Sequence, residues 1–448
     1  MSDSFLVIKF DGISLKDVDA MRDAVRYACK KENKHILIVA AAMAGVNNIL
    51  KAMADALKNR NKDYIAYLNK LETRHLEVAE KLHLQVKGFS DLKNQLGLLR
   101  NLALQISNSK KFLPAFYDHI LSFGELLSSL LLSDVFEEQE KNTEWFDIRQ
   151  VIKTDESFGK AVPDLPLTAE LAENLLVPIL KKNRIVVTQG SIAETVSGKT
   201  TFTALGDADH GACISGAVIH AEKIELWTDA DELVTADRRL VPNAELITEI
   251  TYDEAAELAY FANKSLHPAI LLPAMQKKVP VQIRSILNRE KEGTLILSKR
   301  SEGAGVRAIA FKKSINLINI ISVNMLGSHG FLSRVFQIFE KHQTAVDMVS
   351  TSEISISVTI SDYKNLIAIC EELSKFARVE IYDKQAMIAL IGSKIRNVPG
   401  IAARIFTAVK DINVNIISQG ASQTNLSFMI DESYVEKAIK ALHKEMIE

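Results

Sequence analysis

Residues 184–234 read RIVVTQGSIAETVSGKTTFTALGDADHGACISGAVIHAEKIELWTDADELV, a pattern that predicts a strand, a Gly, Ser and Thr-rich loop, a small-residue helix and a second strand. The second strand ends at Trp227-Thr228-Asp229. In an open α/β sheet, anionic ligands bind beside the carboxyl ends of the strands and at the helix N-termini that follow them. We therefore expect the chemistry of this protein to lie in this segment.

Strands alternate with helices on both sides of this segment. The apolar run Phe5 to Phe10 is followed by an Asp-Gly turn and a helical pattern, which makes a first strand–helix unit. Further runs with the character of strands are His35–Ala42, Glu144–Ile148, Arg184–Val187, Ile224–Thr228 and Val279–Arg284. This alternation predicts an α/β fold with a mainly parallel sheet and helices on both faces, a three-layer α/β/α domain. Lys9 ends the first strand, where a cation reaches phosphate oxygens; a solvated strand-end lysine is the alternative.

Residues from about 50 to 135 have a helical pattern throughout, which predicts an all-helical insertion in the α/β domain. The last of these helices contains Gly124-Glu125 among apolar neighbours. A glutamate in such a place is either a capped surface charge or a group that faces a cleft. The sequence leaves both readings open.

Composition and charge narrow the range of functions and partners that this protein can have. A chain of 448 residues is long enough for about two to four domains, and 47% hydrophobic with 25% charged residues is ordinary for a globular protein. The formal net charge is -2, with acidic and basic residues interspersed, so no charged footprint for nucleic acid or an anionic membrane is present. We expect small molecules or a second copy of the chain as partners.

Three widely spaced cysteines, Cys29, Cys213 and Cys370, form no CxxC pair, which argues against disulfides and zinc ribbons and favours a reducing compartment. The N-terminus has no secretory signal pattern, and no window reaches the roughly 20 apolar residues of a membrane span. We therefore expect a cytoplasmic protein.

A charged, Gly-containing stretch at residues 289–305 predicts a domain boundary, and an internal repeat follows it. The segment from Ile315 and the segment from Ala386 each predict a strand, a helix, two strands and a further helix. Both copies place a glycine directly before the first helix, Gly330 and Gly400. Two such repeats predict a pair of small ferredoxin-like domains whose strand edges pair between chains, hence a homodimer.

The ordered motifs of the whole chain resemble those of the aspartokinase family, an amino-acid kinase domain followed by two ACT domains. Lys9-Phe-Asp-Gly-Ile-Ser14 resembles the family's KFGGTS, and Ala42-Met-Ala-Gly-Val-Asn-Asn-Ile-Leu50 its ASAGVTNLL-like run. Further matches are Ser122-Phe-Gly-Glu-Leu-Leu127 to SHGELLS, Trp227-Thr-Asp229 to WTD, and Phe261-Ala-Asn-Lys-Ser-Leu-His-Pro268 to FGAKVLHP. The repeats resemble the family's NMLxSxGFLxxVF, VDxxxTSE and ISQGAS, and the match is to the lysine-sensitive type.

The resemblance implies phosphorylation of the aspartate β-carboxylate, with ATP and Mg²⁺ as co-substrate, and lysine control through the ACT domains. It implies a kinase domain at residues 1–298, a first ACT domain at 308–383 and a second at 384–448. The catalytic residues would be Lys9 and Asp209, the substrate-binding residues Asn47 and Glu125, and the ATP-binding residues Gly12, Thr228, Asp229, Arg239 and Lys264. The effector-binding residues would be Met325, Ser328, Gly330, Phe331, Leu332, Val346, Asp347, Thr351, Ser352 and Glu353. For Asp347 and Glu353, a pair of solvated loop carboxylates is the alternative.

The sequence departs from the family pattern on the substrate side. Leu205 stands where the family has the arginine that binds the substrate α-carboxylate, and a leucine cannot replace a bidentate guanidinium. Asp11 and Asp207 replace glycines near the phosphates, where each added charge opposes binding by about 1 kcal/mol or more. Other departures are Ile13, Ala41, Met43, Asn47, Ser191, Ala208 and Val234.

Three hypotheses follow. The first is an aspartate kinase of weak activity under lysine control. The second is a non-catalytic homologue that senses amino acids or regulates a partner, and the third is a kinase for another carboxylate. The depleted substrate side favours the last two, whereas the extent of the family match favours the first.

Overall fold

The computed structural model describes residues 4–31, 34–109, 111–139, 142–203, 205–229, 233–261, 267–300, 305–325 and 329–448. The chain forms two compact units. The first comprises residues 1–232 and 267–298, and the second comprises residues 233–266 and 299–448. The predicted kinase domain, residues 1–298, therefore corresponds to the first unit except for residues 233–266, which pack with the C-terminal part.

A mostly parallel sheet forms the centre of the first unit, as predicted. Its strands are β1 (Phe5–Phe10), β2 (His35–Ala40), β3 (Thr143–Trp145), β5 (Ile185–Gln189), β8 (Lys223–Thr228), β10 (Val281–Ser285) and β11 (Thr294–Leu297). They lie in the order β3-β5-β2-β1-β8-β10-β11, and β11 alone among these is antiparallel to its neighbour. β1 and β2 are almost wholly buried, as expected of strands covered on both faces.

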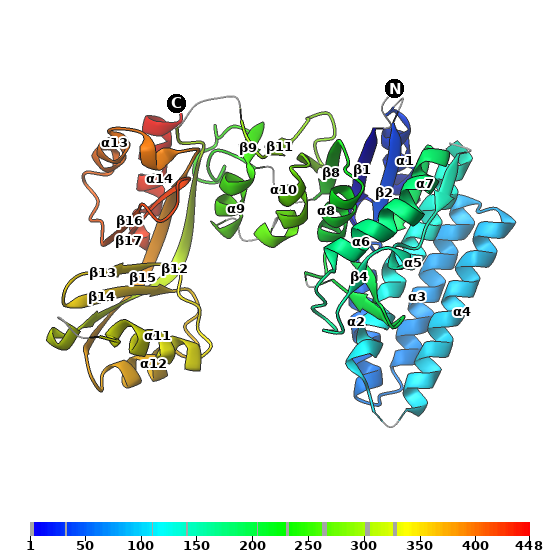
Figure 1. Ribbon diagram of the computed structural model, residues 1–448, viewed down its shortest axis with the longest axis horizontal. Coiled ribbons are helices and arrows are strands. Elements are labelled where there is room, and N and C mark those ends of the chain that lie inside the picture. Colours follow the sequence, from blue (N-terminus) through cyan, green and yellow to red (C-terminus); the bar gives the residue numbers. More distant parts are fainter. Residues whose placement is uncertain are drawn as a thin grey trace. The chain divides into compact units, whose positions relative to one another are not determined.

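Helices surround this sheet (Figure 1). They are α1 (Val18–Cys29), α2 (Val46–Lys58), α3 (Tyr64–Leu82), α4 (Val86–Asn108), α5 (Pro114–Gln139), α6 (Leu165–Leu171), α7 (Val177–Lys182), α8 (Ala208–Val218) and α10 (Leu272–Lys277). A small second sheet contains β4 (Lys153–Thr154), β6 (Ile192–Thr195) and β7 (Thr200–Phe202). Helices α2 to α5 are the helical insertion that the sequence predicts.

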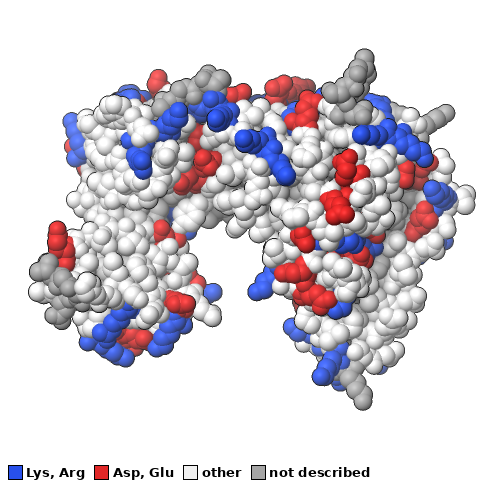
Figure 2. Space-filling view, in the orientation of Figure 1, with Lys and Arg blue, Asp and Glu red and all other residues white. Residues whose placement is uncertain are grey.

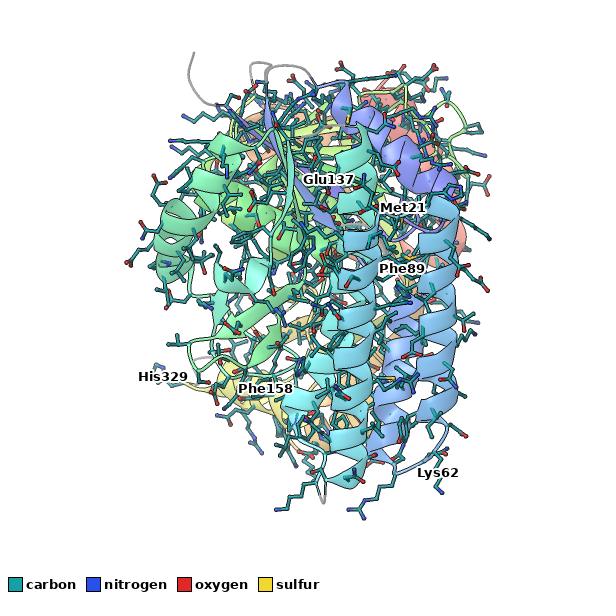
Figure 3. The ribbon with its side chains drawn as sticks, turned by 90° about the vertical axis from the view of Figure 1, so that its right-hand side faces the viewer. Met21, Lys62, Phe89, Glu137, Phe158 and His329 are labelled. Atoms are coloured by element: carbon teal, nitrogen blue, oxygen red, sulfur yellow. The ribbon has the colours of Figure 1, made fainter. Side chains whose placement is uncertain are left out.

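Helix α5 is the core helix of this insertion. Figure 3 shows α3, α4 and α5 side by side, with Lys62 and Glu137 near opposite ends of the bundle. By length and composition α5 resembles a membrane span, contrary to the expectation that no window does, but it is largely buried inside the protein. It also carries the buried carboxylic acids Asp118, Glu125 and Asp134, which suit a core helix with polar contacts.

The second unit contains the two predicted repeats and a preceding strand and helix, β9 (Glu249–Thr251) and α9 (Tyr252–Phe261). The first repeat consists of β12 (Ala308–Ile321), α11 (Phe331–Lys341), β13 (Val349–Thr351), β14 (Ser355–Ile360) and α12 (Leu366–Leu373). The second consists of β15 (Arg378–Ile391), α13 (Ile401–Ala408), β16 (Ile416–Gln419), β17 (Asn425–Asp431) and α14 (Val435–Met446). The order of strands and helices agrees with the sequence prediction.

The two repeats share one sheet, in the order β13-β14-β12-β15-β17-β16. The C-terminal half of β12 pairs with the start of β15, and residues 308–312 pair with residues 387–391. Ile309 accordingly belongs to the core of the second repeat. The start of β12 therefore completes the second ACT domain, which differs from the predicted division at residues 383 and 384. A strand of 14 residues is long enough, at about 3.3 Å per residue, to serve both domains.

Residues 233–247 explain why the compact units differ from the predicted domains. Ala236, Val241 and Ala244 pack in the hydrophobic core of the second repeat. The N–H of Ile309 donates to the carbonyl of Thr235 at 2.8 Å, and the Thr235 hydroxyl lies 3.0 Å from Nε2 of His443 on α14. These contacts attach the segment to the paired repeats although its sequence lies between elements of the first unit.

Candidate active site

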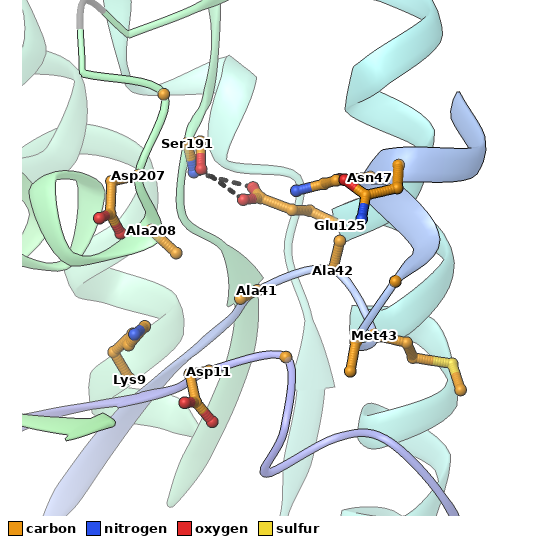
Figure 4. A pocket seen from close by; sticks show the side chains of 15 residues that line it. Lys9, Asp11, Ala41, Ala42, Met43, Asn47, Glu125, Ser191, Asp207 and Ala208 are labelled. Atoms are coloured by element: carbon orange, nitrogen blue, oxygen red, sulfur yellow. Dashed lines mark hydrogen bonds between the residues drawn. The ribbon is translucent and has the colours of Figure 1, made fainter. Parts of the chain in front are cut away.

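A cavity of about 270 Å³ opens in the first unit, at the carboxyl ends of β1 and β2 (Figure 4). The loop after β5, the starts of α2 and α8, and the middle of α5 form its other walls. Its lining residues are Lys9, Asp11, Gly12, Ala41, Ala42, Met43, Ala44, Gly45, Asn47, Asn48, Glu125, Ser191, Gly206, Asp207 and Ala208. This is the sheet edge at which the sequence predicted the chemistry.

Lys9 and Asp209 form a buried ion pair beside this cavity. Lys9 Nζ lies 2.6 Å from Oδ1 of Asp209 and 3.5 Å from the carbonyl oxygen of Trp227. Burial lowers the pKa of Lys9, but Asp209, Asp207 and Asp11 together outweigh this effect and raise it above its ordinary value. Burial raises the pKa of Asp209 to about 6, although the Lys9 ammonium opposes that shift. The surroundings therefore hold Lys9 in its charged form, which excludes the alternative of a solvated strand-end lysine.

The two acidic departures, Asp11 and Asp207, have structural partners. Asp11 Oδ1 accepts from the N–H and the hydroxyl of Ser14, at 2.8 and 2.7 Å, and its Oδ2 accepts from the N–H of Asp229 at 3.1 Å. Asp207 is the N-cap of α8, and its side chain accepts from the N–H of Asp209 at 2.9 Å. Both carboxylates thus use backbone donors that would otherwise be available to an anion.

Glu125 is almost completely buried and faces the cavity, so the structure favours the cleft reading over a surface charge. Its Oε2 accepts from the N–H groups of Gly190 and Ser191 at 2.9 and 2.8 Å, and its Oε1 accepts from the Ser191 hydroxyl at 2.5 Å. Burial raises the pKa of Glu125 to about 7, and these hydrogen bonds oppose that rise. Glu125 is a buried acid that titrates near neutrality.

The rest of the cavity wall on the predicted substrate side offers few positively charged or polar groups. Among the described residues that line the cavity, Lys9 is the single Lys or Arg, and Asp209 forms an ion pair with it. Asn47 lies beside Glu125 in Figure 4, and its Oδ1 is buried without a hydrogen-bond partner in the described part of the chain. Apolar side chains, Ala41, Met43 and Ala208, occupy positions where the family pattern has hydroxyl groups.

The predicted ATP residues are only partly assembled. Gly12 is required by close packing, because a Cβ there would lie 2.6 Å from the carbonyl oxygen of Ala42. Thr228 is the last residue of β8, and Asp229 follows it. The N–H of Asp229 donates to Asp11, which places this strand end beside the turn after β1. Arg239 belongs to the second compact unit, where it forms an ion pair with Asp237, and Lys264 lies outside the described residues.

Asp347, the predicted effector carboxylate, already has partners within the second unit. The Tyr260 hydroxyl donates to its Oδ1 and the Ser361 hydroxyl to its Oδ2. Lys312 Nζ lies 4.0 Å from Oδ1 of Asp347 and 4.7 Å from the centre of the Tyr260 ring. The reading of Asp347 as a simply solvated loop carboxylate is therefore wrong.

The other predicted effector residues lie in two groups of the first repeat. Met325, Gly330, Phe331 and Leu332 precede or begin α11, whereas Val346 precedes β13, Thr351 ends it, and Ser352 and Glu353 follow it. Ser328 lies outside the described residues. Sequence reasoning missed Tyr260, Ser361 and Lys312, because their contacts with Asp347 join distant segments without any local motif.

Fold and site together define an amino-acid kinase with a regulatory ACT pair. The Amino acid kinase family model matches residues 4–285, and an ACT domain model matches residues 318–369 and 388–446. Lysine-sensitive aspartokinase 3 of Escherichia coli is 33% identical over 451 residues, which cover 99% of each chain. The chain belongs to the aspartokinase family, which confirms the resemblance seen in the sequence.

Solved structures agree with this assignment. The crystal structure of E. coli aspartokinase III with lysine and aspartate superposes with a TM-score of 0.84 at 33% identity, over 99% of this chain and 100% of that chain. A second structure of the same enzyme, with aspartate and ADP, has a TM-score of 0.76 at 33% identity and the same coverage. The predicted fold class is therefore confirmed for the whole chain.

Proposed function

We propose that this aspartokinase homologue transfers the γ-phosphoryl group of ATP to the β-carboxylate of L-aspartate, the first step toward lysine, threonine and methionine, at a low rate. The observation that carries the proposal is the buried Lys9–Asp209 pair at the wall of a cavity that Glu125 also lines. The E. coli relative has been crystallised with aspartate, ADP and lysine, the ligand set that we propose for this chain.

Each residue has a role that its chemistry supports. Phosphoryl transfer needs positioning and positive charge more than covalent help from the protein. The Lys9 ammonium stabilises the charge that develops on the transferred phosphoryl oxygens, and Asp209 holds that ammonium in place. Glu125 offers an acceptor for the ammonium of aspartate, and Asn47 lines the substrate side beside it. Gly12, Thr228 and Asp229 form the nearby surface for the nucleotide.

The low rate follows from what the cavity lacks. Among the described residues that line it, the single Lys or Arg is Lys9, which is already paired with Asp209, so none of them offers a free guanidinium or ammonium to the α-carboxylate. A lost charge-assisted contact is worth about 1.5–3 kcal/mol, or roughly 10- to 100-fold. Asp11 and Asp207 add negative charge beside the phosphate position. The same deficit favours the second candidate function, a homologue that senses amino acids without turnover.

Mg²⁺ enters this proposal as part of the nucleotide. No group of three or more His, Cys, Asp or Glu within the described residues is arranged to hold a metal ion. The residues present therefore do not fit a resident metal centre, and we derive no catalytic step through one. Magnesium bound together with ATP would neutralise part of the nucleotide's charge in a cavity that carries several carboxylates.

Lysine control, dimerisation and a cytoplasmic location complete the proposal. Asp347 and the start of α11 supply acceptors and backbone donors suited to an amino-acid effector. The sheet of the ACT pair ends in the short edge strands β13 and β16, which a second copy of the chain can cover. Mixed surface charge, visible in Figure 2, agrees with small-molecule partners and gives no support for nucleic acid.

A coupled assay of ADP release with aspartate and a panel of other carboxylic acids, beside direct ATP binding, tests the function. We expect slow, aspartate-dependent ADP release that lysine inhibits. Turnover near an ordinary enzyme rate, about 10 per second, would contradict the low rate. ATP and lysine binding without turnover of any acid would establish the sensor instead. Sedimentation showing a monomer at micromolar concentration would contradict the dimer.

A further inference from the structure

Ser191 contacts Glu125 through both its backbone and its side chain. Its hydroxyl donates to Oε1 at 2.5 Å, its N–H donates to Oε2 at 2.8 Å, and the N–H of Gly190 donates to the same Oε2 at 2.9 Å. Figure 4 shows the bonds from Ser191 to Glu125 at the cavity wall, with Asn47 on the other side of Glu125. One short loop thus supplies three donors to one buried carboxylate.

This loop is itself fixed by close packing against α8. A Cβ at Gly190 would lie 2.5 Å from the Cβ of Ala208, and one at Gly211 would lie 1.6 Å from the carbonyl oxygen of Gly190. Distances of this kind leave no room for any larger residue at either glycine. The first turn of α8 also carries Asp209, the partner of Lys9. The loop therefore sets the position of Glu125 relative to the Lys9–Asp209 pair.

The charged surroundings make the Ser191 hydroxyl important for the state of Glu125. Burial raises the pKa of Glu125 to about 7, Asp207 at the start of α8 adds to the rise, and the Ser191 hydroxyl lowers it. Lys9 from β1 and Asp11 from the following turn line the same cavity, whereas α2 contributes the neutral Asn47. The Ser191 hydroxyl therefore favours the charged form of this acid, whereas burial and Asp207 oppose it.

We propose that Ser191 is a positioning residue that selects amino acids over simple dicarboxylates: its hydroxyl holds the Glu125 carboxylate in the orientation and charge state that receive a substrate ammonium. The inference rests on the proposed function, because it takes an amine-bearing acid as the ligand. Glu125 lines the cavity and supplies the acceptor for that ammonium, and Asn47 lines the wall beside it. Removing the hydroxyl leaves the cavity shape nearly unchanged and weakens this recognition.

The first test measures Glu125 without any substrate. Its titration can be followed by the infrared carboxyl band, as the difference between each protein and its Glu125→Gln counterpart. In Ser191→Ala the midpoint should rise, whereas Ser191→Thr should keep it. Ser215→Ala is the matched control, because the Ser215 hydroxyl is buried in α8 without a partner among the described residues. An unchanged midpoint in Ser191→Ala would overturn the proposal.

The second test compares L-aspartate with succinate, the same dicarboxylate without the amine, by calorimetry across pH 6 to 9. In Ser191→Ala, aspartate affinity at pH 7 should fall roughly tenfold and recover at higher pH, while succinate affinity stays the same. Equal losses for both acids would show a merely structural role and overturn the proposal. Wild-type protein that binds no aspartate would instead refute the proposed function, and the midpoint shift would still be measurable.

Discussion

Tyr260 of α9 donates its phenolic hydrogen to Oδ1 of Asp347, so the carboxylate predicted to bind the effector is already engaged by its own chain. Burial and the Asp347 charge both raise the pKa of Tyr260, which keeps the phenol protonated and a donor at physiological pH. Lys312, which stacks over the same ring, adds a positive charge beside Asp347. An incoming ammonium must therefore compete with internal partners.

Replacing Tyr260 by Phe should strengthen lysine binding, because one oxygen of Asp347 then loses an internal donor. A hydrogen bond to a charged group contributes about 1.5–3 kcal/mol, and recovery of half of it would tighten binding about fivefold. Calorimetry with lysine measures the change. Tyr382→Phe is a matched control, since the exposed Tyr382 hydroxyl bonds to Glu380 on β15. Weaker lysine binding in Tyr260→Phe would mean that Tyr260 orients Asp347 for the effector.

Restoring the missing substrate contacts should raise the activity. Leu205→Arg together with Ala208→Ser returns a guanidinium to the loop before α8 and a hydroxyl to the first residue of α8, and we expect about a 10- to 100-fold increase in kcat/KM for aspartate. The coupled ADP assay measures it. The single Ala208→Ser change serves as the reference for the arginine. If kcat/KM did not increase in the double variant, the missing guanidinium and hydroxyl would not explain the low rate.

Removing Lys9 should abolish phosphoryl transfer and also destabilise the fold. Lys9→Met leaves the buried Asp209 without its cation, and breaking such a pair costs about 3–5 kcal/mol. The double change Lys9→Met with Asp209→Asn should recover most of that stability and none of the activity. Urea unfolding, together with the ADP assay, separates the two effects. A stable Lys9→Met variant would show that the ion pair contributes little to folding.

The buried His75 of α3 should make stability depend on pH. Burial lowers the pKa of His75 to about 4, whereas an unfolded histidine has a pKa near 6.5. Between these values the unfolded chain binds the proton and the folded one does not, so stability is lost as the pH falls. The contribution is on the order of 3 kcal/mol at pH 4.

His75→Leu should therefore lose less stability than the wild type between pH 6.5 and pH 4, as measured by urea unfolding across that range. Glu125 acts in the opposite direction, since its raised pKa favours the folded state as the pH falls through this range. For that reason the difference between the two proteins is the informative quantity. If both proteins lost the same stability over this pH range, the contribution assigned to His75 would be contradicted.

Much of the fold was predictable because it depends on local sequence patterns. The apolar runs of β1 and β2, the helical periodicity of the insertion and the repeat after residue 305 each depend on neighbouring residues alone. The ordered motifs around Lys9 and Asp209 pointed to the sheet edge at which the cavity lies. For Glu125 the sequence predicted a role, but only the structure showed that the side chain is buried and which three donors hold its carboxylate.

Contacts between distant segments decided the rest. The chain's own sequence determined which segments are strands and helices, because side-chain periodicity and turn residues act over a few positions. Only the tertiary structure decided that Ser191 holds Glu125, that Tyr260 engages Asp347, and that the start of β12 completes the second ACT domain. These pairings carry no local signal, since they depend on how buried surfaces match after the chain has folded.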